Sequence, residues 1–273
     1  MELGIYKREG EHRIFMDKVG FIGCGNMGSV LCSAAVKAIG KENVFAADLS
    51  QSKAAATGAV LSSAEEIAKT CGFVVLGVKP QVLDNAIDEI APIISGRADR
   101  PVIISMAAGV PKEHILAKLN CEVIRIMPNT PCNVGMGMIL YCTSDGITEN
   151  DESAFLKMFE HCGRIDRLDE KYFDSASAIS GCGPAFVYMF AEAMADGGVY
   201  CGLPRDKAIE YAAQTILGSA EMILKSGKHP GKLKDEVTSP GGTTIAGVLA
   251  LENGGFRSSV MNSIIEAKNR TIK

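Results

Sequence analysis

The sequence predicts an α/β protein whose N-terminal part is a Rossmann-like, doubly wound sheet and whose C-terminal part is all-helical. A short apolar strand runs directly into a G-x-G-x-x-G turn at Gly23, Gly25 and Gly28. Strand and helix patterns then alternate as far as position 168, at a spacing typical of a parallel sheet. Beyond that point the pattern contains helices without a convincing strand. The expected domains are a Rossmann dinucleotide-binding domain at 18–168 and a helical domain at 169–273.

The glycine motif is expected to open a dinucleotide-binding site. Its first glycine permits a tight turn, the second lets a pyrophosphate approach the backbone, and the third lets helix and strand pack closely. The helix that follows then offers free N–H groups and its positive dipole end to the phosphates. The plainer alternative is a tight strand–helix turn without a ligand. The cofactor-binding residues expected in this loop are Gly23, Cys24, Gly25, Asn26, Met27 and Gly28.

Composition excludes several classes of protein. The chain has 273 residues, of which 47% are hydrophobic, so it can bury a sizeable core. A formal net charge of −4 without a long basic run argues against a nucleic-acid partner. Nine cysteines without C-x-x-C spacing and four scattered histidines predict no metal site and fit reduced, mostly buried thiols in the cytoplasm. No uninterrupted apolar run reaches the roughly 18 residues of a membrane span, and the charged N-terminus is unlike a signal peptide.

The individual elements follow from hydrophobic periodicity. Residues 1–17 are polar and charged, and we expect an appended extension without a catalytic role; an extra strand or arm is the alternative. The apolar run within 72–78 is typical of a strand buried on both faces, and 81–94 is amphipathic. The predicted strands are 19–23, 43–47, 59–61, 72–78, 101–105, 122–127, 136–142 and 164–168. The predicted helices between them are 29–39, 50–57, 64–70, 81–94, 112–119 and 149–161.

Proline and glycine mark the helices of the C-terminal part. Pro184 and Pro204 stand where proline is tolerated, in a first helical turn, and Gly202 and Gly227 follow helix ends. The helix after Pro184 is apolar around most of its circumference and needs cover on all sides. We therefore expect a second subunit to cover part of this domain. The predicted helices are 170–180, 184–201, 205–226, 243–253 and 256–273.

Asp48 ends the second strand, 20 residues after Gly28. A Rossmann fold places an acid there to bind the adenosine ribose hydroxyls, and its charge would repel the 2′-phosphate of NADPH. Ser50, Ser52 and Lys53 follow at once and could accept that phosphate. The alternative is that Asp48 caps the following helix.

Further strand ends carry residues expected to face the cofactor. Ligands bind at the carboxyl edge of a parallel sheet, which places Val78, Lys79 and Pro80 in the cofactor crevice. Lys79 is expected to be a cofactor or surface contact rather than a catalytic acid. The small residues around Ala107 would admit a flat nicotinamide ring. The turn at 127–131, with two prolines, is equally consistent with a structural and a functional role.

A second loop, at 239–244, is rich in hydroxyl groups and glycine and lies just before a helix. Free N–H groups at a helix N-terminus form an anion site. Since the cofactor phosphates already have a loop, this one is predicted to bind a substrate carboxylate. The alternative is a serine/threonine cap followed by a flexible turn.

Five motifs together resemble the pyrroline-5-carboxylate reductase family. They occur in that family's order and cover essentially everything from Val19 onward. The motifs are Gly-Phe-Ile-Gly-Cys-Gly-Asn-Met-Gly at 20–28, Val-Lys-Pro-Gln at 78–81, Met-Pro-Asn-Thr-Pro at 127–131, Ser-Gly-Cys-Gly-Pro-Ala at 180–185 and Asp-Glu-Val-Thr-Ser-Pro-Gly-Gly-Thr-Thr at 235–244.

This resemblance implies reduction of 1-pyrroline-5-carboxylate to L-proline by NADPH or NADH, the last step of proline biosynthesis. It also implies an all-helical dimerisation domain, with active sites built across a homodimer or a higher oligomer of dimers. The family's hydroxyl beside the imine nitrogen maps onto Thr244, and its nicotinamide-side contacts map onto Val78, Lys79 and Ala107. Its substrate loop maps onto Ser239, Gly241, Gly242, Thr243 and Thr244.

The expected mechanism relies on positioning, because an iminium is already a strong electrophile. The helix at 184–201, expected to face the nicotinamide, contains no lysine or histidine that could act as an acid. Two other functions remain open: another imine or ketone reductase on the same two-domain plan, and a non-enzymatic nucleotide-sensing dimer. The loop at 239–244 argues against the sensor, which would not need it.

Overall fold

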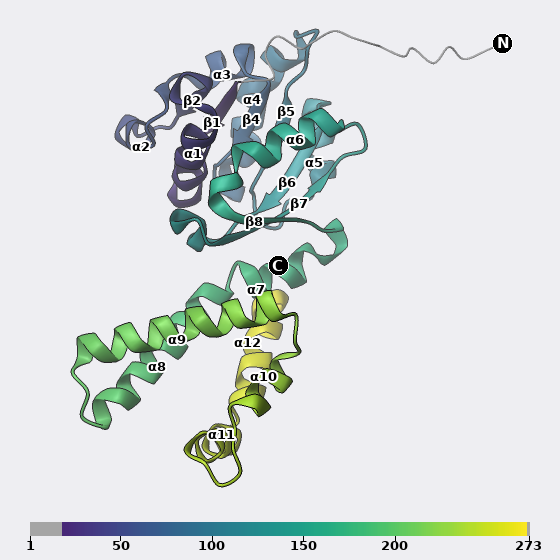
Figure 1. Cartoon of the computed structure of the whole chain (residues 1–273). Helices are drawn as coiled ribbons and strands as arrows, with labels where there is room; N and C mark the ends of the chain where they lie inside the picture. Colours follow the sequence, from purple (N-terminus) through teal and green to yellow (C-terminus); the bar gives the residue numbers. More distant parts are fainter. Residues whose placement is uncertain (1–17, 272–273) are drawn as a thin grey trace, which may run out of the picture. The chain divides into compact units, whose positions relative to one another are not determined.

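The computed structural model describes residues 18–271, so the extension expected at 1–17 lies outside the described residues. The chain divides into two compact units, one ending at Gly181 and the other beginning at Cys182 (Figure 1). Each unit is considered by itself.

The first unit is built on one eight-stranded sheet with the order β3-β2-β1-β4-β5-β6-β7-β8. All neighbouring strands are parallel except β6 and β7, which are antiparallel. The connection from β6 to β7 is too short for the crossover that parallel strands require. Every predicted strand is confirmed: β1 Val19–Ile22, β2 Val44–Ala47, β3 Val60–Leu61, β4 Phe73–Leu76, β5 Val102–Ser105, β6 Val123–Met127, β7 Gly137–Thr143 and β8 Gly163–Arg167.

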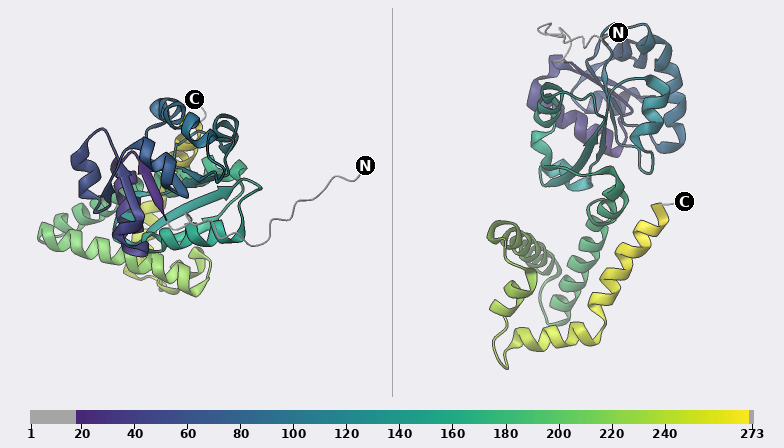
Figure 2. Two further views of the ribbon diagram at one scale, coloured as in Figure 1. Left: turned by 90° about the horizontal axis from the view of Figure 1, so that it is seen from above. Right: turned by 90° about the vertical axis from the view of Figure 1, so that its right-hand side faces the viewer.

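Helices cover both faces of this sheet (Figures 1 and 2). Successive strand residues point to opposite faces, so Phe21 packs on one side and Ile22 on the other. Phe21 meets Phe159 edge-on, with ring centroids 6.5 Å apart, just after α6. One face carries α1 (Asn26–Ile39), α2 (Gln51–Ala56) and α6 (Glu149–Met158), and the other carries α3 (Ala64–Thr70), α4 (Pro80–Ser95) and α5 (Lys112–Leu119).

Short 3₁₀ turns complete the first unit. The helix predicted at 149–161 is α6 followed by the turn η3 (Glu160–Cys162). The helix predicted at 170–180 is the turn η4 (Glu170–Tyr172) followed by α7 (Phe173–Ser180). The remaining turns are η1 (Lys41–Asn43) and η2 (Thr130–Val134).

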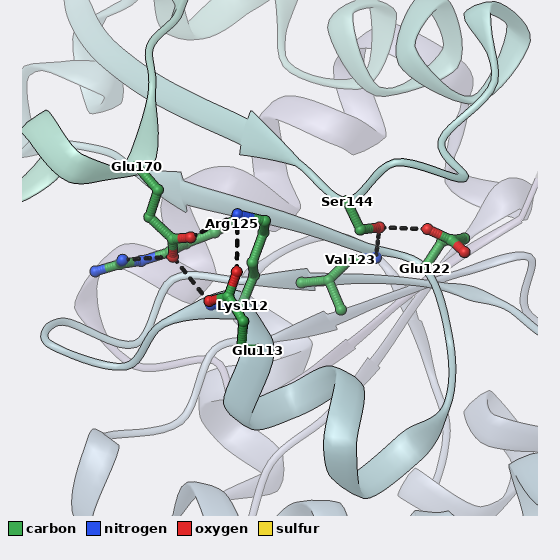
Figure 3. A network of polar contacts seen from close by, with 7 residues as sticks. All are labelled: Lys112, Glu113, Glu122, Val123, Arg125, Ser144 and Glu170. Carbon is green, nitrogen blue, oxygen red and sulfur yellow. Dashed lines mark hydrogen bonds and ion pairs between the residues drawn. The ribbon is translucent and has the colours of Figure 1, made fainter.

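A partly buried ion-pair network joins η4 to the sheet and to Lys112 at the start of α5 (Figure 3). The Glu170 carboxylate accepts from Arg125 Nη1 on β6 at 2.7 Å and from Lys112 Nζ at 2.7 Å, and the Lys112 N–H donates to it at 2.9 Å. Burial disfavours the charged carboxylate, but these hydrogen bonds outweigh it and lower the pKa of Glu170. The Arg125 guanidinium also lies 4.9 Å from the centroid of Phe173.

These contacts place the first turns after residue 169 with the sheet, so the compact units divide at 181/182. The domain boundary at 168/169 remains a prediction.

The second unit is all-helical within the described residues. Its helices are α8 (Gly183–Tyr200), α9 (Arg205–Ser226), α10 (Pro230–Glu236), α11 (Thr243–Asn253) and α12 (Phe256–Thr271). Gly227 has φ +65° and ends α9, as its position predicts. The seven-residue α10 was not predicted from the sequence. It begins at Pro230, with the N–H of Gly231 donating to the His229 ring, and glycine at that position obscures the helical pattern.

The second unit leaves many large apolar side chains exposed in the single chain. Tyr188 and Met189 on α8 are 62% and 68% exposed, and Leu249 on α11 is 60% exposed. Beyond Cys182, the buried hydrophobic residues within the described part are Ala195, Ala208 and Ala212. Such faces require a covering surface.

One helical stretch, Glu170–Tyr200, reaches the length and composition of a membrane-spanning helix. The most apolar part of this stretch is only 11% buried. The helix is interrupted within this stretch by a turn at Gly181 and Cys182, between α7 and α8. An apolar helix covered by a second subunit has the same composition, so the stretch by itself is weak evidence for a membrane.

Candidate active site

The carboxyl ends of four parallel strands meet at one edge of the sheet. The last residues of β2, β1, β4 and β5 are paired in one row. The chain reverses its direction of winding between β1 and β4, which is the switch point where open α/β sheets bind ligands. The residues that follow the row bring their backbones to this edge: Asp48, Gly23, Gly77 and Met106.

Two glycines of the first loop are required by close backbone packing. Gly23 has φ +96°, and a Cβ there would lie 2.8 Å from the carbonyl carbon of Gly77. A Cβ at Gly28 would collide with the Gly23 carbonyl oxygen, as would one at Gly77. Sequence reasoning did not single out Gly77, although a glycine immediately after a buried strand was the available signal.

Gly25 differs, because a Cβ placed on it meets no atom within 4 Å. Its φ of −67° is open to any residue. Neither the local backbone nor packing therefore explains a glycine at this position. The open space above Gly25 fits the close approach of a pyrophosphate.

The start of α1 has the donors that an anion needs. Within the described residues, the backbone N–H groups of Gly25, Asn26, Met27 and Gly28 have no hydrogen-bond acceptor, while Ser29 donates to the Gly25 carbonyl at 2.9 Å. The first turn of α1 contains no acidic residue. The residues present therefore fit the phosphates of a dinucleotide.

Cys24 lies beside these donors as an uncharged thiol. Its hydrogen bond with the Cys32 thiol, together with burial and the nearby Asp48 carboxylate, raises the pKa of Cys24. All nine cysteines are free thiols, and seven of them are buried. No group of three or more His, Cys, Asp or Glu that could hold a metal ion occurs within residues 18–271.

Asp48 connects the two loops at this edge. Its Oδ2 accepts from the Cys24 N–H at 2.7 Å, and its Oδ1 accepts from the Ser50 N–H at 2.8 Å. Ser50 is the N-cap of α2, and no side-chain hydrogen bond caps that helix. The carboxylate therefore fixes the glycine loop and the turn into α2, and its oxygens keep further acceptor capacity for a ribose hydroxyl.

Removing the charge of Asp48 is expected to favour NADPH. For Asp48→Ser, we expect the KM for NADPH relative to NADH to fall about tenfold, because a repulsion of roughly 1.4 kcal/mol is lost. Steady-state kinetics with both cofactors measure the ratio. Asp48→Asn also removes the charge, but its amide oxygen can still accept from the Cys24 N–H. Comparing the two variants separates the effect of the charge from the effect of losing that hydrogen bond. An unchanged ratio in both variants would contradict a role for the charge.

The residues expected on the nicotinamide side lie along the same edge. A Cβ at Gly23 would be 2.8 Å from Val78 Cγ1, so the structure places Val78 beside the glycine loop. Lys79 is exposed and is the N-cap of α4, and Pro80 starts that helix. Ala107 is 1% exposed and follows the next strand, with its N–H donating to Ser105 Oγ at 3.4 Å. The roles of these residues in cofactor binding remain predictions.

The loop predicted to bind the substrate lies in the second unit, between α10 and α11. Gly241 has φ +69°, and the Gly242 N–H donates to the Ser239 carbonyl at 3.0 Å, which closes the turn. That bond occupies the Gly242 N–H and counts against its expected contact with a carboxylate. Within the described residues, the N–H groups of Gly241, Thr243 and Thr244 have no acceptor.

Thr244 is exposed in the first turn of α11, and its hydroxyl has no partner among the described side chains. The first turn of α11 contains no acidic residue. The loop therefore has the donors and the dipole expected of an anion site.

The fold and its two N–H-rich loops define a nucleotide-dependent oxidoreductase with a C-terminal helical domain. Residues 18–109 match the family described as NADP oxidoreductase, coenzyme F420-dependent. Residues 170–273 match the family described as pyrroline-5-carboxylate reductase dimerisation. The chain belongs to the pyrroline-5-carboxylate reductase family.

Relatives and solved structures agree with this membership. Pyrroline-5-carboxylate reductase of Pisum sativum is 40% identical over 260 residues, covering 93% of this chain and 94% of the relative. That of Escherichia coli is 35% identical over 265 residues, covering 94% and 97%. The crystal structure of Plasmodium falciparum pyrroline carboxylate reductase with NADP bound is 37% identical, with a TM-score of 0.85 over 94% of this chain and 98% of that one.

Proposed function

We propose that this chain reduces 1-pyrroline-5-carboxylate to L-proline with NADPH or NADH, as a step of proline biosynthesis. The observation that carries the proposal is the loop Ser239–Thr244, whose sequence and free N–H groups suit a substrate carboxylate. Membership of the family supports it independently.

In this proposal the N–H groups of Gly25, Asn26, Met27 and Gly28 hold the cofactor pyrophosphate. A bound reduced nicotinamide supplies the hydride. Val78, Lys79, Pro80 and Ala107 would contact the nicotinamide ring, and Asp48 would bind the adenosine ribose. On the substrate side, the N–H groups of Gly241 and Thr243 hold the carboxylate, and Thr244 Oγ1 hydrogen-bonds the ring nitrogen.

A second function, reduction of a ketone, has less support in the chain. Reduction of a carbonyl needs a group that delivers a proton to the oxygen. Helix α8 contains no lysine or histidine, and the only polar side-chain groups of the loop Ser239–Thr244 are hydroxyls. An iminium nitrogen already carries its proton, so its reduction does not need such a group.

The active form is proposed to be a homodimer, or a higher oligomer of dimers, in the cytoplasm. The exposed apolar side chains of α8, α9 and α11 support a second subunit, as does the match to a dimerisation family. Free thiols, most of them buried, support a reducing compartment. No nucleic-acid or membrane partner is proposed.

The purified protein is expected to oxidise NADPH and NADH when 1-pyrroline-5-carboxylate is added, followed at the nicotinamide absorbance. A 2-oxo acid of equal length is the matched control and should give no turnover. Analytical ultracentrifugation should show a dimer or a larger species. The interface between its subunits is expected to bury more than about 1,000 Å². Turnover with the oxo acid but not with 1-pyrroline-5-carboxylate would contradict the proposed substrate. A fully active monomer would contradict the proposed homodimer.

A further inference from the structure

The helical stretch that crosses from the first unit into the second is interrupted at a proline. In an uninterrupted α-helix, each carbonyl accepts from the N–H four residues further on. The acceptor paired with position 184 is the carbonyl of Ser180, the last residue of α7. Pro184 has no N–H, so the Ser180 carbonyl cannot be satisfied within the helix.

The partner of this carbonyl comes from a distant part of the sequence. Asn129 Nδ2 donates to the Ser180 carbonyl at 2.9 Å, across 51 positions of sequence. Asn129 lies after the end of β6, in the turn whose role the sequence left open, and is the N-cap of η2. Its side chain therefore supplies the hydrogen bond that Pro184 removes.

The other atom of the same amide is also engaged. Asn129 Oδ1 accepts from the Met138 N–H at 2.9 Å, at the start of β7. The Asn129 carbonyl accepts from the Cys132 N–H at 3.1 Å. Because both ends of the amide are held, the donor is fixed relative to the sheet, and the end of α7 is fixed with it.

We propose that Asn129 is a positioning residue of the reductase, which fixes the break between α7 and α8 by binding the Ser180 carbonyl. The inference rests on the proposed function. The glycine loop belongs to the unit that ends at Gly181, and the loop Ser239–Thr244 belongs to the unit that begins at Cys182. Covalently, the chain enters the second unit through this break. If the reaction needs both loops, a change at this covalent link is expected to lower the rate of reduction and to leave nucleotide binding, which uses the first unit alone, unchanged.

Asn129→Asp tests the donated hydrogen bond. The carboxylate can still accept from Met138, but it cannot donate to Ser180 and opposes that carbonyl with its charge. We expect kcat with 1-pyrroline-5-carboxylate to fall about 10- to 100-fold, because small misplacements of reacting groups have effects of this size. The nucleotide dissociation constant, measured by nicotinamide fluorescence, should stay within about twofold.

Asn133→Asp is the matched control. Asn133 lies in the same turn and is exposed, and its side chain has no hydrogen bond within the described residues. The control should keep wild-type kcat and nucleotide affinity. Equal loss of kcat in both variants would overturn the proposal.

Pro184→Ala tests the same break without touching Asn129, and it serves if Asn129→Asp does not fold. The new N–H at position 184 can take the Ser180 carbonyl into a continuous helix. We expect lower kcat with unchanged nucleotide affinity. Wild-type kcat in this variant, or loss of nucleotide binding together with kcat in either, would overturn the positioning role. An inactive wild-type protein would instead contradict the proposed function.

Discussion

Replacing Gly25 with valine is expected to abolish measurable nucleotide binding while leaving the fold intact. A Cβ at Gly25 meets no protein atom within 4 Å, and its backbone conformation is open to valine. The side chain would instead occupy the space in which the pyrophosphate approaches the free N–H groups of α1. Nicotinamide fluorescence titration and thermal unfolding measure the two effects separately.

Gly28→Ala is the matched comparison within the same loop. Its Cβ would collide with the Gly23 carbonyl oxygen, so the loop must shift and the melting temperature should fall. The two variants therefore separate a glycine needed by the ligand from a glycine needed by the fold. Wild-type nucleotide affinity in Gly25→Val would show that the cofactor does not lie on this loop.

Replacing Thr244 with alanine is expected to lower kcat/KM by about tenfold to a hundredfold without abolishing turnover. Thr244 has a hydroxyl but no ionisable group, so its proposed role is to orient the ring nitrogen through one hydrogen bond. A hydrogen bond to a charged group contributes about 1.5–3 kcal/mol, which corresponds to a factor of this size. Initial rates at varied 1-pyrroline-5-carboxylate concentration give the ratio.

Nucleotide affinity should be nearly unchanged in Thr244→Ala, because the free N–H groups for the phosphates lie in the first unit. Thr244→Ser retains the hydroxyl and should recover most of the lost activity. If Thr244→Ala keeps wild-type kcat/KM, or loses nucleotide binding as severely as Gly25→Val, the substrate does not bind at this loop.

Most helices and strands of both units could be predicted, because glycine and proline residues separate the apolar patterns of successive elements. Helices α3, α5, α9 and α11 have the predicted bounds, since glycine or proline lies near many of the ends. The antiparallel pairing of β6 with β7 was not predicted, because hydrophobic periodicity does not record strand direction. Helix α10 was missed because it begins with Pro230 and Gly231, which are more typical of a turn than of a helix.

The site could be predicted only where its chemistry lies in consecutive residues. The loops at 23–28 and 239–244 each consist of consecutive residues, so each can be recognised directly in the sequence. The contacts of Asp48 with Cys24 and of Asn129 with Ser180 span 24 and 51 positions. Such pairs depend on which strands become neighbours, so a single sequence does not reveal them. The hydrogen bond from the Gly242 N–H to the Ser239 carbonyl is local, but it forms only when the turn closes, and the residue types do not show which N–H the turn will use.

The exposed apolar faces of the second unit link its folding to protein concentration. A unit whose described core consists of three alanines has little free energy of its own to offset the ordering of five helices. Under the proposed assembly, that free energy comes from association and obeys mass action. The melting temperature then rises with protomer concentration, and dilution reduces the folded fraction of the helical unit before it affects the sheet.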